Sequence, residues 1–168
     1  MVDIKPSVTI RLASDEDAPA IAHLIHSIQV DEFAVPISLE DQPDIGVIEA
    51  IYIETGGTFH VAEAEGQIIG SIGLEDLGGG NAALRKLYVA KDFRGRGLGL
   101  AHKLLALVLE HAAKKDISHI YLGVAQEFAS ARRFYEKSGF HLVGEEALPV
   151  NFPKTVVDKY FYRFSLGY

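Results

Sequence analysis

The 168-residue sequence contains no cysteine and no long apolar run. Without cysteine, disulfide scaffolds, thiolate metal sites and cysteine nucleophiles are all excluded. No apolar stretch approaches the roughly 18 residues that a membrane-spanning helix requires. The first ten residues, MVDIKPSVTI, also lack the charged and apolar regions of a secretion signal. We therefore expect a cytoplasmic protein that does not associate with membranes.

Basic residues are scarce in the first half of the chain. Residues 1–80 contain 15 acidic but only two basic residues, a net charge of −13, whereas residues 81–168 carry a net charge of +6. The basic excess is densest between Arg85 and Arg96. One short basic segment on an acidic protein argues against nucleic-acid binding and favours a small anionic ligand. The acidic half favours a cationic partner.

The length and the hydrophobic content of 48% are typical of one domain, which we place at residues 1–168. Periodicity, capping residues and turn residues define eleven elements. The expected strands cover 7–13, 58–64, 68–76, 83–89, 118–124, 140–145 and 159–166, and the expected helices cover 14–29, 44–54, 97–114 and 130–138. This order predicts a mixed sheet with helices on both faces.

The stretch DFRGRGLG, residues 92–99, places glycines at every second position between an expected strand and an expected helix. The first N–H groups of a helix lack internal partners and attract anions, so this arrangement is typical of a phosphate site. It is not a P-loop, because no second glycine precedes Lys103 in the required G-x-x-x-x-G-K-[ST] pattern. The spacing G-x-G-x-G also differs from the dinucleotide-binding pattern G-x-G-x-x-G.

A second motif, SARRFYEKSGF, lies near the C-terminus. Ala131, Phe134 and Tyr135 are spaced to share one face of a short helix, which Gly139 ends. A tyrosine with an ordinary pKa of about 10 keeps its proton at neutral pH and can donate it to a group that gains negative charge.

The two motifs together resemble the GCN5-related N-acetyltransferase (GNAT) family, through Arg94-x-x-Gly97-x-Gly99 after the strand LYV and through AxxFYEKxGF. The resemblance implies a single-domain α/β (α+β) fold with a mixed, mostly antiparallel sheet of about six to seven strands and about four helices. It implies acetyl-CoA as co-substrate and no metal. The pyrophosphate would bind to Arg94, Gly95, Arg96, Gly97, Leu98 and Gly99, and the pantetheine arm to Leu87, Tyr88 and Val89. Tyr135 would be the general acid toward the CoA thiolate.

The chain departs from the family pattern at two positions. Phe128 stands where many relatives have a cofactor-binding asparagine, a role left to Gln126 or Ser130. Ala83 stands near the position where relatives often have a glutamate. The general base is therefore open among Glu75, His60, Glu63 and water.

The resemblance implies an enzyme that moves an acetyl group by direct attack to a primary amine of a small molecule or peptide. The acidic half favours a cationic acceptor, although a hydrophobic or peptide acceptor stays open, and a homodimer is compatible with the sequence. A non-catalytic acyl-CoA-binding regulatory domain is the alternative function.

Overall fold

A computed structural model describes residues 7–95 and 97–167 and has a seven-stranded sheet at its centre, in the order β1-β2-β3-β4-β5-β7-β6. The strands are β1 (Thr9–Leu12), β2 (Thr58–Ala64), β3 (Gln67–Gly78), β4 (Asn81–Val89), β5 (His119–Ala125), β6 (His141–Val143) and β7 (Asp158–Ser165). Neighbouring strands are antiparallel except β4 and β5, which are parallel. The predicted mixed, mostly antiparallel sheet is confirmed.

Three α-helices flank the sheet in the described residues: α1 (Ala18–His26), α2 (Leu100–Lys114) and α3 (Ala129–Lys137). After α1 the chain continues as the π-helical turn η2 (Ser27–Glu32). The single helix predicted at 44–54 is wrong, because this segment forms a 3₁₀ turn, η3 (Pro43–Gly46), and a π-helical turn, η4 (Glu49–Ile53). Val47 separates the two with a non-helical backbone (φ −136°, ψ 55°) directly after Gly46, a poor helix former.

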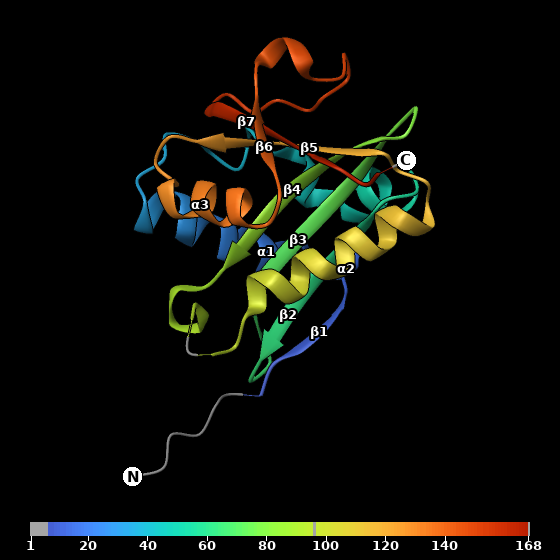
Figure 1. Ribbon diagram of the computed structural model, residues 1–168. Helices are drawn as coiled ribbons and strands as arrows, with labels where there is room; N and C mark the ends of the chain where they lie inside the picture. Colours follow the sequence, from blue (N-terminus) through green and yellow to red (C-terminus); the bar gives the residue numbers. More distant parts are fainter. Residues whose placement is uncertain (1–6, 96, 168) are drawn as a thin grey trace.

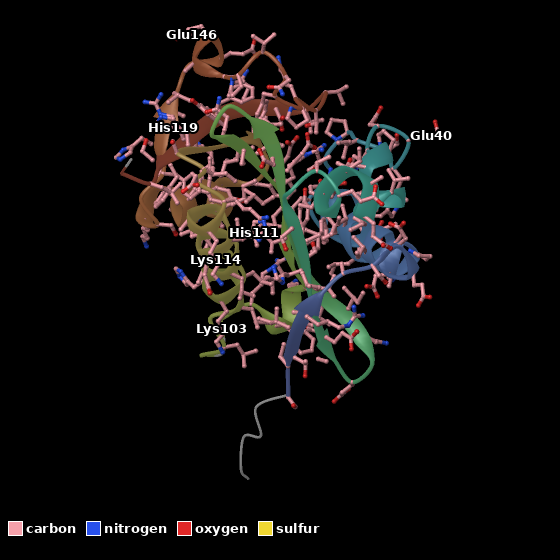
Figure 2. The ribbon with its side chains drawn as sticks, turned by 90° about the vertical axis from the view of Figure 1, so that its right-hand side faces the viewer. Glu40, Lys103, His111, Lys114, His119 and Glu146 are labelled. Atoms are coloured by element: carbon pink, nitrogen blue, oxygen red, sulfur yellow. The ribbon has the colours of Figure 1, made fainter. Side chains whose placement is uncertain are left out.

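The helices form layers on the two faces of the sheet. In Figure 1, α2 lies in front of the sheet and α1 behind it. Figure 2 shows the sheet between the two layers, with Lys103 and Lys114 of α2 on one side and Glu40 on the other. Leu104 and Val108 of α2 are fully buried in one apolar cluster, and Ile21 and Ile25 of α1 are fully buried in a second. Each such side chain contributes about 1.5–3 kcal/mol by burial.

In residues 7–95 and 97–167, no helix combines the length and the apolar character needed to cross a bilayer.

The sheet opens between β4 and β5. These strands pair only where Asn81–Ala83 lies beside His119–Tyr121, and then they diverge, as Figure 1 shows. On its other edge, β4 stays paired with β3 at residues 84, 85, 88 and 89, and residues 122–125 of β5 stay paired with β7. The divergence therefore creates a V-shaped opening inside the sheet, with strand edges on both sides.

Candidate functional site

A cavity of about 600 Å³ occupies the opening between β4 and β5. Its walls come from residues 84–89 of β4, residues 123–125 of β5 and α3 as far as Tyr135. The turn η2, the loop that follows it as far as Gln42, and the segment 152–158 before and at the start of β7 complete it. Segments distant in the sequence thus meet at the point where the sheet splits.

The predicted pantetheine-binding residues Leu87, Tyr88 and Val89 line this cavity. Tyr88 and Val89 pair with Ser71 and Gly70 of β3, and the pairing with β5 on the other edge ends at Ala83. This edge of β4 therefore borders the cavity instead of a neighbouring strand.

The predicted phosphate loop has an unusual backbone. Gly95, Gly97 and Gly99 have φ values of +68°, +71° and +58°, a region that side chains with a Cβ rarely adopt. A Cβ on Gly95 or Gly99 would meet no protein atom within 4 Å. Glycine is therefore required here because of the left-handed backbone, and not because neighbouring protein atoms leave no room for a side chain.

Helix α2 begins at Leu100, three residues later than predicted, with Gly99 as its N-cap and no side-chain cap hydrogen bond. The start of α2 therefore has no side-chain cap. Leu98, by contrast, is buried in the apolar cluster under α2. Arg96 lies outside the described residues.

Arg94 lines the cavity and connects β4 with η2. Its Nε donates a hydrogen bond to the carbonyl oxygen of Val89 (2.8 Å), and its Nη2 donates to Glu32 Oε1 (2.7 Å) at the end of η2. The guanidinium also lies 5.6 Å from the ring centre of Phe33. This ion pair lowers the pKa of Glu32.

Tyr135 lies on α3, is 7% exposed and lines the cavity. Its ring packs edge-on against Phe140, with the ring centres 5.5 Å apart. Burial raises the pKa of the Tyr135 phenol well above its ordinary value, so the hydroxyl keeps its proton at neutral pH.

Phe128, the departure from the family pattern, forms an apolar wall of the cavity. Its ring packs edge-on against Phe33 at 5.1 Å and against Tyr88 at 6.0 Å between ring centres. Ser130 also lines the cavity, whereas Gln126 is absent from the lining among the described residues.

The three side chains considered as general base lie elsewhere. Glu75 accepts a hydrogen bond from Arg85 Nη1 (3.0 Å), and Glu63 accepts one from Arg11 Nε (2.7 Å). Burial, with a smaller effect of His111, lowers the pKa of His60. Within the described chain, none of the three candidates lines the cavity, whose carboxylates include Asp158 and Glu127.

A buried polar network that the sequence analysis missed closes the end of the cavity away from the glycine loop. Gln29 Nε2 donates to the Tyr88 hydroxyl (2.8 Å) and to Gln42 Oε1 (3.0 Å), and Gln42 Nε2 donates to Gln29 Oε1 (2.8 Å). Lys86 Nζ also donates to Gln42 Oε1, at 2.7 Å. No local motif marks these residues, since the network joins positions up to 59 residues apart.

Comparisons with known proteins agree with this architecture. Residues 22–140 match the model of the acetyltransferase (GNAT) family. A GNAT-family acetyltransferase from Staphylococcus aureus Mu50, known from a crystal structure, has a TM-score of 0.91 and 36% identity, covering 95% of this chain and 99% of that one.

Two curated relatives are also similar. The uncharacterized N-acetyltransferase YjgM of Escherichia coli K12 is 29% identical over 83% of this chain and 86% of its own length. N-acetylaspartate synthetase of Danio rerio is 36% identical over 61% of this chain, and the matched region spans only 36% of the synthetase.

Proposed function

Since the chain belongs to the acetyltransferase (GNAT) family, we propose that it transfers an acetyl group from acetyl-CoA to a primary amine of a small molecule or peptide. The observation that carries this proposal is the opening between β4 and β5, where the edge of Leu87–Val89 and the Tyr135 side chain border one cavity. We propose the whole chain, residues 1–168, as a single N-acetyltransferase domain that acts in the cytoplasm.

The glycine loop and the adjoining edge of β4 form one end of the cavity, the cofactor end, and their backbone suits acetyl-CoA. Backbone turns with positive φ and an uncapped helix start present N–H groups that bind phosphate. Gly95, Gly97 and Gly99 and the start of α2 would hold the pyrophosphate. The edge of β4 at Leu87–Val89 would hydrogen-bond the pantetheine arm, as an added strand would. When bound, acetyl-CoA supplies the thioester whose acetyl group is transferred.

In the proposed reaction the neutral amine attacks the thioester carbonyl carbon, a C–N bond forms and the C–S bond breaks. Main-chain N–H groups of Leu87–Val89 stabilise the carbonyl oxygen as it gains charge. Tyr135 donates its proton to the departing sulfur and recovers a proton from the attacking nitrogen through water. Water has this role because Glu75, His60 and Glu63 are not among the described residues that line the cavity.

Release of CoA thiol in the presence of an amine panel tests the proposed activity. The Tyr135→Phe variant should lower kcat about 10²–10³-fold with little change in the Kd of CoA, because it loses the proton donor and keeps the ring. Tyr160→Phe is the matched control, since Tyr160 lies on β7 and its ring centre is 3.6 Å from the guanidinium carbon of Arg132 on α3. Full turnover by Tyr135→Phe would remove Tyr135 from the mechanism. CoA binding without thiol release for any amine would instead support a non-catalytic acyl-CoA-binding domain.

A further inference from the structure

Lys86 lies in a bulge of β4 and lines the cavity. Gly73 pairs with Arg85 and Ser71 pairs with Tyr88, so Lys86 and Leu87 together face a single residue of β3. Lys86 has a φ of +60°, which costs about 1–2 kcal/mol for a residue with a side chain. The fully buried Ser71 stabilises the bulge by donating its hydroxyl hydrogen to the Lys86 carbonyl oxygen (2.7 Å). Such strain at a cavity wall is typical of a position that serves a function.

The Lys86 ammonium is buried, with 5% of its side chain exposed, and its close partner is neutral. Nζ donates to the amide oxygen of Gln42 at 2.7 Å, whereas Asp44 Oδ1 is 3.8 Å away. Asp44 is already engaged by the Tyr52 hydroxyl (2.6 Å) and by Arg85 (3.4 Å). Burial lowers the pKa of Lys86 to about 8. An ammonium has three hydrogens, so an anion in the cavity would complete its hydrogen bonding.

Asp158 brings a negative charge to the same cavity from β7. Its Oδ2 accepts a hydrogen bond from the Thr155 N–H (2.9 Å). A Cβ added to Gly123 of β5 would lie 2.5 Å from the Asp158 carboxylate. The absence of a side chain at position 123 therefore leaves space for the Asp158 carboxylate. Lys86 and Asp158 thus line the same cavity, and the charge of Asp158 opposes the lowering of the Lys86 pKa.

We infer that the acceptor carries a carboxylate as well as its amine, with Lys86 binding the carboxylate and Asp158 accepting a hydrogen bond from the neutral amine. This inference rests on the proposed acetyl transfer and names its substrate class: an amino acid or an amino carboxylate of similar size. The neighbouring walls are apolar and include Phe33, Val35, Phe152 and Val157, which favours an apolar side chain on the acceptor.

The net charge of the first half of the chain does not contradict this inference, because several of its acids are already paired. Glu32 pairs with Arg94, and both Asp44 and Glu75 pair with Arg85. These pairs join the acidic and basic halves of the sequence. They reduce the negative field at the end of the cavity where Lys86 lies, the acceptor end. The chemistry of the acceptor therefore follows from the groups that line the cavity rather than from net charge.

The test measures kcat/KM for the common L-amino acids and β-alanine, each beside its decarboxylated amine and, where stable, its methyl ester. We expect at least tenfold higher kcat/KM for the preferred amino carboxylate than for its decarboxylated amine. The Lys86→Met variant should lose about 10- to 100-fold in kcat/KM for that carboxylate, through KM, and less than about threefold for the decarboxylated amine. Lys114→Met is the matched control, with a side chain 72% exposed on α2.

Two further measurements keep the outcomes distinct. Asp158→Asn should raise the KM for the same amino carboxylate while the Kd of CoA, measured by calorimetry, stays unchanged. If Lys86→Met does not fold, Lys86→Gln and the substrate pairs on the unaltered enzyme decide the question. Turnover only of amines that lack a carboxylate, or no turnover of any amino carboxylate by an enzyme that binds acetyl-CoA, would overturn the inference. Absence of acetyl-CoA binding would overturn the proposed function itself.

Discussion

The two ends of the cavity are built from different parts of the polypeptide. The end beside α2 consists largely of backbone: the free edge of β4, three glycines with positive φ and a helix start without a side-chain cap. The other end consists of side chains that contact one another, namely Gln29, Gln42, Lys86 and Tyr88. The glycine loop is continuous in sequence, whereas Lys86 and Gln42 are 44 residues apart.

This difference suggests a division of tasks. Backbone groups can bind a co-substrate whose form is the same in every reaction of the family, and only a few glycines are needed to place them. Side chains determine which acceptor binds, since they can be replaced one at a time without altering the backbone. The predictions below test whether the two ends can be changed separately.

The largest effect is expected at the cofactor end, in the Gly99→Val variant. Valine is strained at the φ of +58°, so the loop should shift and the affinity for CoA should fall about 10- to 100-fold by calorimetry. Gly66→Val is the matched control, because Gly66 has a φ of +76°, equally open surroundings and a place in the hairpin between β2 and β3. Both variants should lower the melting temperature, but equal losses of CoA affinity would refute a specific role for the loop.

A second prediction concerns the stability of the acceptor end as a function of pH. Burial lowers the pKa of Lys86 from 10.5 to about 8, with Asp44 and Asp158 opposing the shift and Arg85 adding to it. The unfolded chain therefore binds more protons between pH 8 and 10.5, and the contribution of Lys86 to the free energy of unfolding rises with pH in that range. From pH 7.5 to 10, the free energy of unfolding measured with urea should rise by about 2 kcal/mol more in the unaltered protein than in Lys86→Met. Parallel pH curves would show that Lys86 titrates normally.

The third prediction breaks the polar network at Gln42. In Gln42→Met, Lys86 loses its amide partner and Gln29 loses both hydrogen bonds to Gln42. The kcat/KM for the acceptor should fall about tenfold, as expected for one misplaced charged contact, while the Kd of CoA changes less than about twofold. The exposed Gln67→Met provides the control. A parallel loss of CoA affinity would show that the two ends are not independent.

The smallest effect is expected for Glu32→Gln, which removes the partner of Arg94. Loss of the carboxylate frees Arg94 for a phosphate, so CoA should bind about two- to fivefold more tightly, as expected for a partly exposed ion pair. Glu110→Gln, which alters the exposed pair with Lys114, should leave the Kd of CoA unchanged. Weaker CoA binding by Glu32→Gln would instead mean that Glu32 holds Arg94 in its binding position.

Local patterns in the sequence predicted most of the fold. Alternation and helical periodicity located the strands and the three α-helices, and the glycine loop located the start of α2 to within three residues. The insertion of β7 between β5 and β6 was not predicted, because strand order depends on contacts between residues such as Tyr162 and Leu122. The acceptor end was missed for the same reason: single Gln and Lys residues carry no local pattern, and their meeting depends on the tertiary fold.

The short pairing between β4 and β5 has a thermodynamic consequence. Only three residues of each strand hold the four-stranded block β1–β4 to the block β5–β7–β6 through the sheet. Blocks joined by so few backbone hydrogen bonds tend to open as separate cooperative units, which native-state hydrogen exchange can resolve. A ligand that hydrogen-bonds across the seam takes the place of the missing sheet pairing, so that its binding energy adds directly to the energy holding the two blocks together.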